Sequence, residues 1–546
     1  MSTAVPAAQN DLSYARGGAQ PALLETTIGA NLAAIASRYP DHDALVDVPA
    51  GRRFSYTELV AEVRRLATGL LHAGIRPGDR VGIWAPNSAE WVLTQYASAE
   101  IGAVLVNVNP AYRSHELAYA LKQSGVALVI SAKRFKTSDY VVMLQEVAPE
   151  CPELREVVFI GGSRWQELTG TPIDATALSQ VAATLRADDP INIQYTSGTT
   201  GYPKGATLSH RNILNNGYLV GELLGYTPAD RICLPVPLYH CFGSVMGSLA
   251  ATSHGATIVL PGPGFEPAAT LRAVQDEACT SLYGVPTMFI AELGLADFAE
   301  YDLTSLRSGI MAGSPCPAEV MRRVIDDMQM TGVAICYGMT ETSPVSTQTR
   351  GEDSLVQRVE TVGRVGPHLE IKLTDPATGV TVPRGQVGEL CTRGYSVMTG
   401  YWNDPDKTAE AIDTEGWMHT GDLAVMDGDG YLRITGRIKD MVIRGGENIY
   451  PREIEEFLYT HPDIRDAQVI GVPDDTYGEE LMAVVMMRDG APPLTVERLR
   501  EFCTGRLAHF KVPRYVRVVT EFPMTVTGKV RKDEMRQQAI EHLGGG

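Results

Sequence analysis

The sequence predicts an α/β protein with a large N-terminal domain of parallel βαβ-type sheets, a small β subdomain and a separate α+β C-terminal domain. The chain has 546 residues, enough for about three or four domains of roughly 150 residues each. Up to about residue 330, helix-period segments alternate with short apolar runs, a pattern typical of βαβ units. Beyond about residue 360, shorter strand-like runs are separated by turns rich in Gly, Asp and Pro, which indicates smaller sheets.

In chain order, a helix is expected over 56–74, and strands are expected at VGIWA, AVLVNV, ALVIS, EVVFI, INIQYTS and ATIVL, which occupy 81–85, 103–108, 127–131, 156–160, 191–197 and 256–260. The composition changes most sharply at GRIKD (436–440), between a strand-like run and an apolar stretch followed by a glycine pair. We therefore expect a flexible tail over 1–20, the N-terminal domain over 21–436 and the C-terminal domain over 437–546.

DGDG (427–430) is interpreted as a hairpin turn. A calcium loop starting at Asp427 would place Tyr431, Leu432 and Ile438 at its fifth, sixth and twelfth positions, where such a loop needs ligands and a glycine.

Charge and cysteine content exclude several classes of protein. Lys and Arg number 47 against 65 Asp and Glu, so the net charge of −18 argues against a broad nucleic-acid-binding surface. The 8 cysteines are scattered without a C-x-x-C pair, so we expect buried thiols rather than disulfides or a zinc site. We find neither a signal-peptide pattern nor a run of about 18 apolar residues, and we expect a cytoplasmic protein without a transmembrane segment. The oligomeric state stays open, a homodimer included.

A glycine-rich loop, YTSGTTGYPKG (195–205), follows the strand expected at INIQ. Its glycines allow backbone N–H groups to converge, its hydroxyls add donors, and Lys204 adds a positive charge, which together favour a phosphate-binding loop. The loop differs from a Walker A motif, because Lys204 follows Pro203 and precedes Gly205. A polar surface loop is the alternative interpretation. Ser209 is expected to cap the helix that follows.

This loop resembles the phosphate-loop signature of the acyl-adenylate-forming (AMP-binding) enzymes, which include acyl-CoA synthetases, adenylation domains of peptide synthetases and luciferases. Further segments are similar to the family's other signatures, in its order: YGMTETSP (337–344), GWMHTGD (416–422), GRIKDMVIRGGENIYPREIE (436–455) and TGKVRK (527–532). Within the family, the strongest resemblance is to medium-chain acyl-CoA synthetases, through PVPLYHCFGSV (235–245), LYGVPTMF (282–289), RGYSVMTGYW (393–402) and HFKVPRY (509–515).

The resemblance implies an AMP-forming acid–thiol ligase that uses ATP, Mg²⁺ and CoA. A carboxylate would attack the α-phosphorus of ATP and expel pyrophosphate, and a thiol would then attack the acyl-adenylate and expel AMP. Because a carboxylate is a weak nucleophile and ATP is a polyanion, such a site needs cations and N–H donors around the phosphates.

The resemblance also implies roles for individual residues. Glu341 is expected to bind Mg²⁺, because a hard cation prefers carboxylate oxygens, and Asp422 to accept hydrogen bonds from the ribose hydroxyls. Tyr337 is expected to stack on adenine. The other residues implied to contact ATP are Thr196, Ser197, Gly198, Thr199, Thr200, Gly201, Lys204, Gly313, Ser314, Gly338, Thr340 and Arg437.

The C-terminal domain of the family is mobile and serves both half-reactions. By position, Lys439 is the expected hinge, and Lys529 is the expected catalytic lysine of adenylation. Rotation would replace Lys529 by the face carrying Arg444, Gly445 and Gly446, past which the pantetheine arm of CoA would run. Taken alone, Glu341 and Lys529 would be solvated charges, Tyr337 a core residue and Asp422 a turn residue.

The acid is expected to lie against aromatic, small and apolar residues, namely His240, Phe242, Gly243, Val285, Thr287 and Met288. None of them is a carboxylate that could pair with a substrate ammonium, so a medium- to long-chain fatty acid is the expected substrate, and its exact chain length stays open. His240 is expected to gate the pocket or orient the carboxylate, and a structural histidine is the alternative. Two other functions stay open: a fatty acyl-AMP ligase that serves a carrier protein, and a non-catalytic nucleotide-binding protein.

Overall fold

The computed structural model describes residues 11–196, 203–314, 316–445, 447–474, 476–524 and 530–544. The chain divides into two compact units. The larger unit comprises Ala15–Ile371 and Thr392–His419, and the smaller comprises Lys372–Cys391, Thr420–Gly546 and the chain up to Tyr14. Among the described helices, none is long and apolar enough to cross a membrane.

A seven-stranded sheet of the larger unit has the order β21-β11-β10-β5-β4-β6-β9. From β10 to β9 the neighbouring strands are parallel, and β11 is antiparallel to both of its neighbours. The strands are β4 (Arg80–Trp84), β5 (Val104–Asn107), β6 (Val126–Ser131), β9 (Glu156–Phe159), β10 (Pro190–Thr196), β11 (Lys204–Ser209) and β21 (Gly400–Tyr401).

A nine-stranded sheet of the same unit has the order β18-β17-β16-β15-β14-β12-β13-β2-β3. Its middle strands, from β16 to β2, are parallel. The strands are β2 (Asp43–Asp47), β3 (Arg52–Ser55), β12 (Arg231–Cys233), β13 (Thr257–Leu260), β14 (Ser281–Gly284), β15 (Ser308–Ala312), β16 (Gly332–Gly338), β17 (Val345–Gln348) and β18 (Arg364–Val365). All six apolar runs singled out in the sequence form strands of these two sheets, and the parallel βαβ prediction is confirmed.

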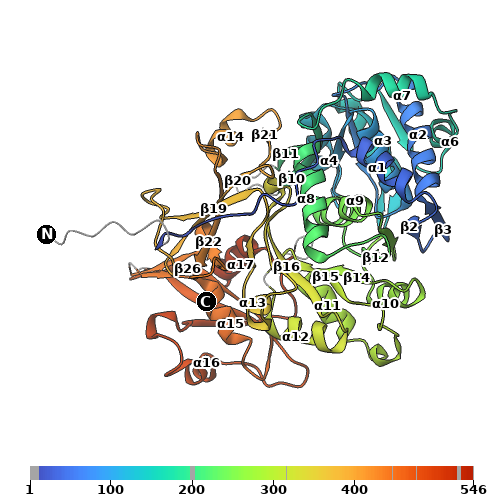
Figure 1. Ribbon diagram of the computed structural model, residues 1–546. Helices are drawn as coiled ribbons and strands as arrows, with labels where there is room; N and C mark the ends of the chain where they lie inside the picture. The colour runs from blue at the N-terminus through green and yellow to red at the C-terminus, as the bar shows by residue number, and fades with distance from the viewer. Residues whose placement is uncertain are drawn as a thin grey trace. The chain divides into compact units, whose positions relative to one another are not determined.

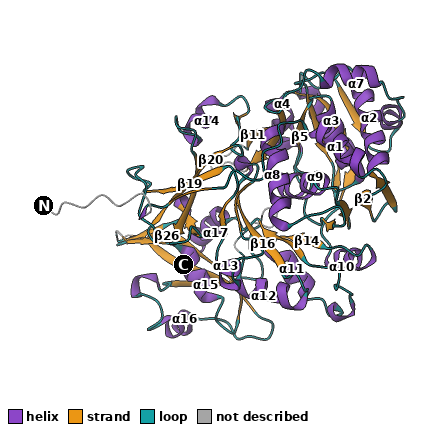
Figure 2. Ribbon diagram, in the orientation of Figure 1, coloured by secondary structure: helices purple, strands orange, loops and turns teal. Residues whose placement is uncertain are grey.

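Helices cover these sheets because their apolar faces pack on strands that are buried on both sides. Figure 1 shows α1 (Ile28–Arg38), α2 (Tyr56–His72) and α3 (Ala89–Glu100) packed together, and Figure 2 shows α10 (Pro267–Asp276), α11 (Pro286–Leu293) and α12 (Ala318–Asp327) beside the nine-stranded sheet. The remaining helices of the unit are α4 (Ser114–Ser124), α5 (Tyr140–Val147), α6 (Ser163–Thr169), α7 (Ala175–Ala182), α8 (His210–Leu224), α9 (Ala250–Ser253), α13 (Leu355–Glu360) and α14 (Pro405–Ala411).

Local signals in the sequence explain where several elements begin and end. The side chain of Ser209 accepts a hydrogen bond from Asn212 N at the start of α8, which confirms the predicted cap. Gly225 ends α8 in the left-handed conformation, at φ 65°.

Seven of the eight cysteines are buried, Cys316 is partly exposed, and all eight are free thiols, as expected.

The smaller sheets follow in the order expected from the sequence. One has the order β1-β19-β20-β22-β23, with β1 (Tyr14–Arg16), β19 (Leu369–Thr374), β20 (Val387–Gly394), β22 (Met418–Met426) and β23 (Leu432–Arg437). The DGDG segment joins β22 to β23, and Asp427 N donates to Tyr431 O at 3.0 Å, which confirms the predicted hairpin turn.

The C-terminal part of the smaller unit is an α+β structure. Its sheet has the order β25-β24-β27-β26, and β28 is parallel to β27. The elements are β24 (Val442–Arg444), β25 (Glu447–Ile449), α15 (Pro451–Leu458), β26 (Ile464–Asp474), β27 (Gly478–Met487), α16 (Val496–Cys503), β28 (Tyr515–Val518) and α17 (Lys532–Gly544).

Candidate active site

Parallel strands of the nine-stranded sheet bring distant parts of the sequence to one edge. Strands β12, β14, β15 and β16 run parallel, so their carboxyl ends lie at the same edge. His240 lies in the segment after β12, Val285 follows β14, Gly313 follows β15, and Tyr337 lies near the end of β16. Ligands of open α/β sheets bind at such an edge. The fold therefore brings together the segments predicted to hold adenine and the acid.

Four side chains, Thr196, Lys204, Glu341 and Tyr401, form what we call the Glu341 cluster. Thr196 Oγ1 donates a hydrogen bond to Glu341 Oε1 at 3.2 Å, and the Tyr401 hydroxyl donates to the same oxygen at 2.9 Å. Lys204 Nζ lies 4.9 Å from the centroid of the Tyr401 ring. Glu341 is only 5% exposed. The cluster thus joins a buried carboxylate to Tyr401, whose ring lies beside the ammonium group of Lys204.

Burial raises the pKa of Tyr401, and the neighbouring Glu341 carboxylate raises it further. The phenol therefore stays protonated at any physiological pH. It acts as a hydrogen-bond donor that fixes Glu341 rather than as a base.

Strand pairing explains how the cluster forms. β10 and β11 are antiparallel, with Thr196 opposite Lys204, so the two ends of the glycine-rich loop meet. β21 pairs with β11 and places Tyr401 opposite Ala206. Glu341 lies in a single 3-10 turn, η5 (Thr340–Thr342), and its carbonyl accepts a hydrogen bond from Met398 N at 2.9 Å. The predicted loop residues Ser197, Gly198, Thr199, Thr200 and Gly201 lie outside the described residues.

Glycines shape the chain at the ends of β15 and β16. A Cβ at Gly338 would lie 1.8 Å from Pro344 O, so the turn at the start of YGMTETSP cannot close with any other residue. Gly313 has φ 90°, a conformation that L side chains rarely adopt, and Ser314 follows it. Thr340 is 9% exposed, and its Oγ1 lies 3.8 Å from Cys241 Sγ, next to the predicted acyl segment.

The segment carrying His240 has an unusual backbone. Phe242 N donates to His240 Nδ1 at 3.1 Å, so the neutral imidazole carries its hydrogen on Nε2. A π-helix, η3 (Phe242–Leu249), follows directly, and π-helical turns are frequent at functional sites. A Cβ at Gly243 would lie 2.3 Å from Pro237 O, so glycine is required for this close approach.

The predicted acyl residues differ in exposure. Phe242 and Val285 are buried, at 5% and 8% exposure, and the Phe242 ring lies 5.7 Å from the Tyr283 ring. Met288 is half-buried and Thr287 is exposed.

In the smaller unit, the two predicted ribose and phosphate contacts form a pair. Asp422 on β22 lies opposite Arg437 on β23. Arg437 Nε donates to Asp422 Oδ1 at 3.0 Å, and the side chain of Asp422 is 12% exposed against 51% for Arg437. The arginine thus holds the carboxylate in place and has surface left for a ligand.

The hairpin formed by β24 and β25 is fixed by an ion pair between a partly exposed arginine and a buried glutamate. Arg444 Nη2 lies 2.7 Å from Glu480 Oε1, and its guanidinium lies 4.5 Å from the centroid of the Tyr477 ring. Gly445 turns the chain at φ 59°, and its N–H donates to Tyr477 O at 2.8 Å. Gly446 lies outside the described residues. The hairpin is therefore anchored through Arg444, whose side chain is 16% exposed.

Lys439 is exposed and lies in a single 3-10 turn, η6 (Ile438–Asp440), between β23 and β24. Lys529 lies outside the described residues, but the residues on either side of its segment, Met524 and Val530, form an antiparallel bridge. After it, Lys532 Nζ donates to Glu455 Oε1 at 2.5 Å and to Val469 O at 3.1 Å.

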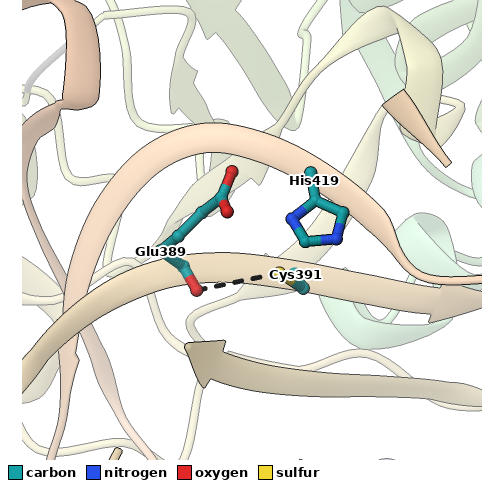
Figure 3. A group of neighbouring side chains, drawn as sticks. All are labelled: Glu389, Cys391 and His419. Atoms are coloured by element: carbon teal, nitrogen blue, oxygen red, sulfur yellow. Dashed lines mark hydrogen bonds between the residues drawn. The ribbon is translucent and has the colours of Figure 1, made fainter. Parts of the chain in front are cut away.

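Figure 3 shows another group of side chains with atoms that could bind a metal, Glu389, Cys391 and His419, whose ligand atoms lie within 4.8 Å of one another. Glu389 Oε1 accepts a hydrogen bond from Gly421 N at 3.1 Å, and Cys391 Sγ donates to Glu389 O at 3.8 Å. These contacts use the groups for hydrogen bonds between and within strands, and we assign no metal to them.

Sequence reasoning missed Tyr401, the hydroxyl that holds Glu341. It lies within RGYSVMTGYW, but no local pattern indicates that its hydroxyl reaches a residue sixty positions earlier in the chain. Sequence reasoning also missed three buried amides, Asn107 on β5 and Asn192 and Gln194 on β10. The two on β10 could have been found, because they alternate with apolar residues in INIQ and therefore share one face of a strand.

Comparisons with known proteins place the chain in a family. Residues 32–402 match the AMP-binding enzyme family, and residues 453–529 match the AMP-binding enzyme C-terminal domain. YngI of Bacillus subtilis (strain 168) is 48% identical over 95% of this chain and 98% of its own. The mitochondrial medium-chain acyl-CoA ligase ACSF2 of Danio rerio is 45% identical over 97% of this chain and 91% of its own.

Solved structures agree with this placement. The anthranilate CoA ligase AuaEII in complex with anthranoyl-AMP matches with a TM-score of 0.87 at 27% identity, over 95% of this chain and 98% of its own. ATP-bound MatB from Rhodopseudomonas palustris matches with a TM-score of 0.82 at 30% identity, over 95% of this chain and 100% of its own. The chain therefore belongs to the AMP-binding enzyme family.

Proposed function

We propose that the protein is a fatty acid–CoA ligase that converts a medium-chain fatty acid to acyl-AMP and pyrophosphate, and then to acyl-CoA and AMP. The observation that carries this proposal is the Glu341 cluster, which puts a buried carboxylate and Lys204 at the mouth of a hairpin suited to phosphate. The reaction class, an AMP-forming acid–thiol ligase, follows from the family. The acid is proposed from the apolar pocket residues and from relatives named medium-chain acyl-CoA ligase.

In the first half-reaction, the carboxylate of the acid attacks the α-phosphorus, and pyrophosphate leaves. Lys204 and the hydroxyl of Thr196 lie where the ends of the glycine-rich loop meet, so they are suited to bind phosphate oxygens. The positive charge of Lys204 would lower the repulsion between the attacking carboxylate and the phosphates of ATP, and it would stabilise the negative charge that develops on the leaving pyrophosphate. Lys529 is proposed to bring a second ammonium group to the reacting oxygens.

Mg²⁺ is proposed to bind at Glu341. The site fits a hard divalent cation, because a buried carboxylate offers oxygen ligands and because Thr196 and Tyr401 fix its orientation by hydrogen bonds to Oε1. When bound, the cation would neutralise phosphate charge. Tyr401 and Thr196 would keep the carboxylate aimed at it.

The adenosine moiety is proposed to lie between Gly313, Ser314 and Tyr337 at the sheet edge, with Gly338 and Thr340 beside it. Asp422 would accept hydrogen bonds from the ribose hydroxyls, and Arg437 would hold Asp422 and reach a phosphate oxygen. His240, with its hydrogen on Nε2, would donate a hydrogen bond to the carboxylate of the acid.

In the second half-reaction, the C-terminal domain is proposed to rotate about Lys439 and to replace Lys529 by the hairpin carrying Arg444, Gly445 and Gly446. The pair between Arg444 and Glu480 keeps this hairpin rigid, which suits a surface that guides the pantetheine arm of CoA. We propose that 21–436 and 437–546 act as the two functional domains, and that the enzyme works in the cytoplasm.

The competing function is a fatty acyl-AMP ligase that serves a carrier protein. Pyrophosphate release with octanoate, ATP and Mg²⁺, measured with and without CoA, separates the two. We expect octanoyl-CoA to form when CoA is present. Octanoyl-AMP that accumulates unchanged in the presence of CoA would favour the adenylate ligase, and no pyrophosphate release with any acid of a broad panel would contradict both.

A further inference from the structure

Buried amide side chains link two neighbouring strands of the seven-stranded sheet, β10 and β5. Asn192 and Gln194 lie on β10, and Asn107 ends the neighbouring strand β5. Their exposed fractions are 4%, 3% and 3%. Burying an amide is costly unless its polar atoms find partners. The identity of those partners therefore indicates what the amides do.

The hydrogen bonds of these amides run in one direction. Gln194 Nε2 donates to Asn192 Oδ1 at 2.8 Å. Asn192 Nδ2 donates to Asn107 Oδ1 at 3.0 Å and to Leu105 O at 2.9 Å. Asn107 Nδ2 then donates to Tyr239 O at 3.0 Å. Asn192 and Asn107 each use the oxygen as an acceptor and the nitrogen as a donor, so reversing either amide would place like groups against each other.

The two ends of this amide chain lie at two functional segments. Gln194 comes two residues before Thr196, which belongs to the Glu341 cluster. Tyr239, at the other end, comes directly before His240. The amide chain thus joins the strand that leads into the phosphate loop to the segment that carries the predicted carboxylate contact.

Another buried asparagine, outside the amide chain, binds the segment before His240. Asn87, which follows β4, is 7% exposed. Its Oδ1 accepts a hydrogen bond from Leu238 N at 2.8 Å, and its Nδ2 donates to Val236 O at 2.9 Å. Backbone groups of the segment before His240 are therefore bound by side chains from the ends of two strands of the other sheet.

We propose that Asn107 and Asn192 are positioning residues that set the place of His240 relative to the phosphate loop. The proposal rests on the proposed function, in which His240 binds the carboxylate that attacks ATP. In-line attack depends on geometry, and an error of about 1 Å can lower a rate by about 100-fold. A directional chain of hydrogen bonds between the two segments fixes their spacing, because each bond has a narrow range of length and angle.

Asn107→Asp tests this proposal with little change of shape. The carboxylate keeps an acceptor for Asn192 but loses the N–H that binds Tyr239 O, and it places an oxygen against that carbonyl. We expect kcat/KM for octanoate to fall at least tenfold while KM for ATP stays within about twofold of the wild-type value. Asn107→Ala removes the same donor without adding a charge and serves as the second variant if the aspartate prevents folding.

Asn215→Asp is the matched control. Asn215 is fully buried on α8, and its Nδ2 donates to Leu24 O at 3.1 Å and to Arg211 O at 2.9 Å, in contacts that do not involve the His240 segment. The chemical change and the burial are the same, so a general loss of stability should appear equally in both variants. A thermal melting curve of each variant shows whether the variant is fully folded at the assay temperature.

A double-mutant cycle with His240→Ala decides the question. If Asn107 acts through His240, Asn107→Asp should lower kcat/KM for octanoate by less than about twofold in the His240→Ala background. Additive losses, an equal rise in KM for ATP, or an effect no larger than that of Asn215→Asp would overturn the proposal. A wild-type enzyme that releases no pyrophosphate with octanoate would contradict the proposed function itself, and with it the role assigned to Asn107.

Discussion

Tyr401→Phe is the sharpest test of the Glu341 cluster. The substitution removes one hydroxyl and keeps the aromatic ring beside Lys204. The distance from Lys204 Nζ to the centroid of that ring is 4.9 Å. The lost hydrogen bond, at 2.9 Å, has the carboxylate of Glu341 as its acceptor. A hydrogen bond to a charged group contributes about 1.5–3 kcal/mol. At about 1.4 kcal/mol for each factor of ten, we expect the rate of pyrophosphate release to fall about 10- to 150-fold.

Tyr56→Phe is the control for this substitution. The Tyr56 hydroxyl is fully buried and donates to Ala256 O at 2.7 Å, next to the start of β13 and therefore at the amino edge of the sheet. We expect it to cost stability but little activity. Because the pKa of Tyr401 is raised, the ratio of wild-type to Tyr401→Phe rates should be constant from about pH 6 to pH 9. Equal activity losses in the two variants would refute the role assigned to the Tyr401 hydroxyl.

Three further predictions concern other parts of the chain. Asp422→Asn should raise KM for ATP about tenfold and leave KM for octanoate nearly unchanged in steady-state kinetics. The amide carries no charge to pair with Arg437, and it offers the ribose hydroxyls one acceptor fewer. A larger effect on KM for octanoate than on KM for ATP would contradict the ribose role. Lys529→Ala should abolish pyrophosphate release while thioester formation from supplied octanoyl-AMP stays largely intact, and equal damage to both steps would contradict the division between Lys529 and the Arg444 hairpin. Glu292 on α11 is 1% exposed, no described group binds its Oε2, and burial raises its pKa well above the usual value. The folded protein therefore keeps the Glu292 proton at a pH where the unfolded chain has lost it. The free energy of unfolding is unaffected by Glu292 ionisation below the unfolded pKa of about 4.3, and it falls as pH rises from there toward the folded pKa. Glu292→Leu should raise the free energy of unfolding at pH 7 by about 1–3 kcal/mol and flatten its pH dependence above about pH 4.5, as measured by urea denaturation; an unchanged pH dependence would show that Glu292 titrates normally.

Much of the fold could be predicted from the sequence because its signals are local. Apolar runs such as VGIWA and ATIVL are too short for helices and too apolar for surface strands, and they form the buried strands β4 and β13. Ser209 and the Asp427 turn likewise act through hydrogen bonds to residues within four positions. Such signals do not depend on the rest of the chain.

The geometry of the site could not be predicted in the same way. The hydrogen bonds of Glu341 come from Thr196 and Tyr401, which lie 145 and 60 positions away in the chain. Only the pairing of β10, β11 and β21 brings these residues together, and strand pairing is not encoded locally. The resemblance to a family supplied the candidate residues, whereas the fold supplied the partners that fix them.

The central claim is that a carboxylate attacks the α-phosphorus of ATP and that CoA then displaces AMP. Octanoate labelled with ¹⁸O in both carboxyl oxygens tests it directly, with mass spectrometry of the products of a reaction with ATP, Mg²⁺ and CoA. The account predicts one ¹⁸O atom in each AMP, one in each octanoyl-CoA and none in pyrophosphate. Unlabelled AMP together with label in phosphate or pyrophosphate would contradict it.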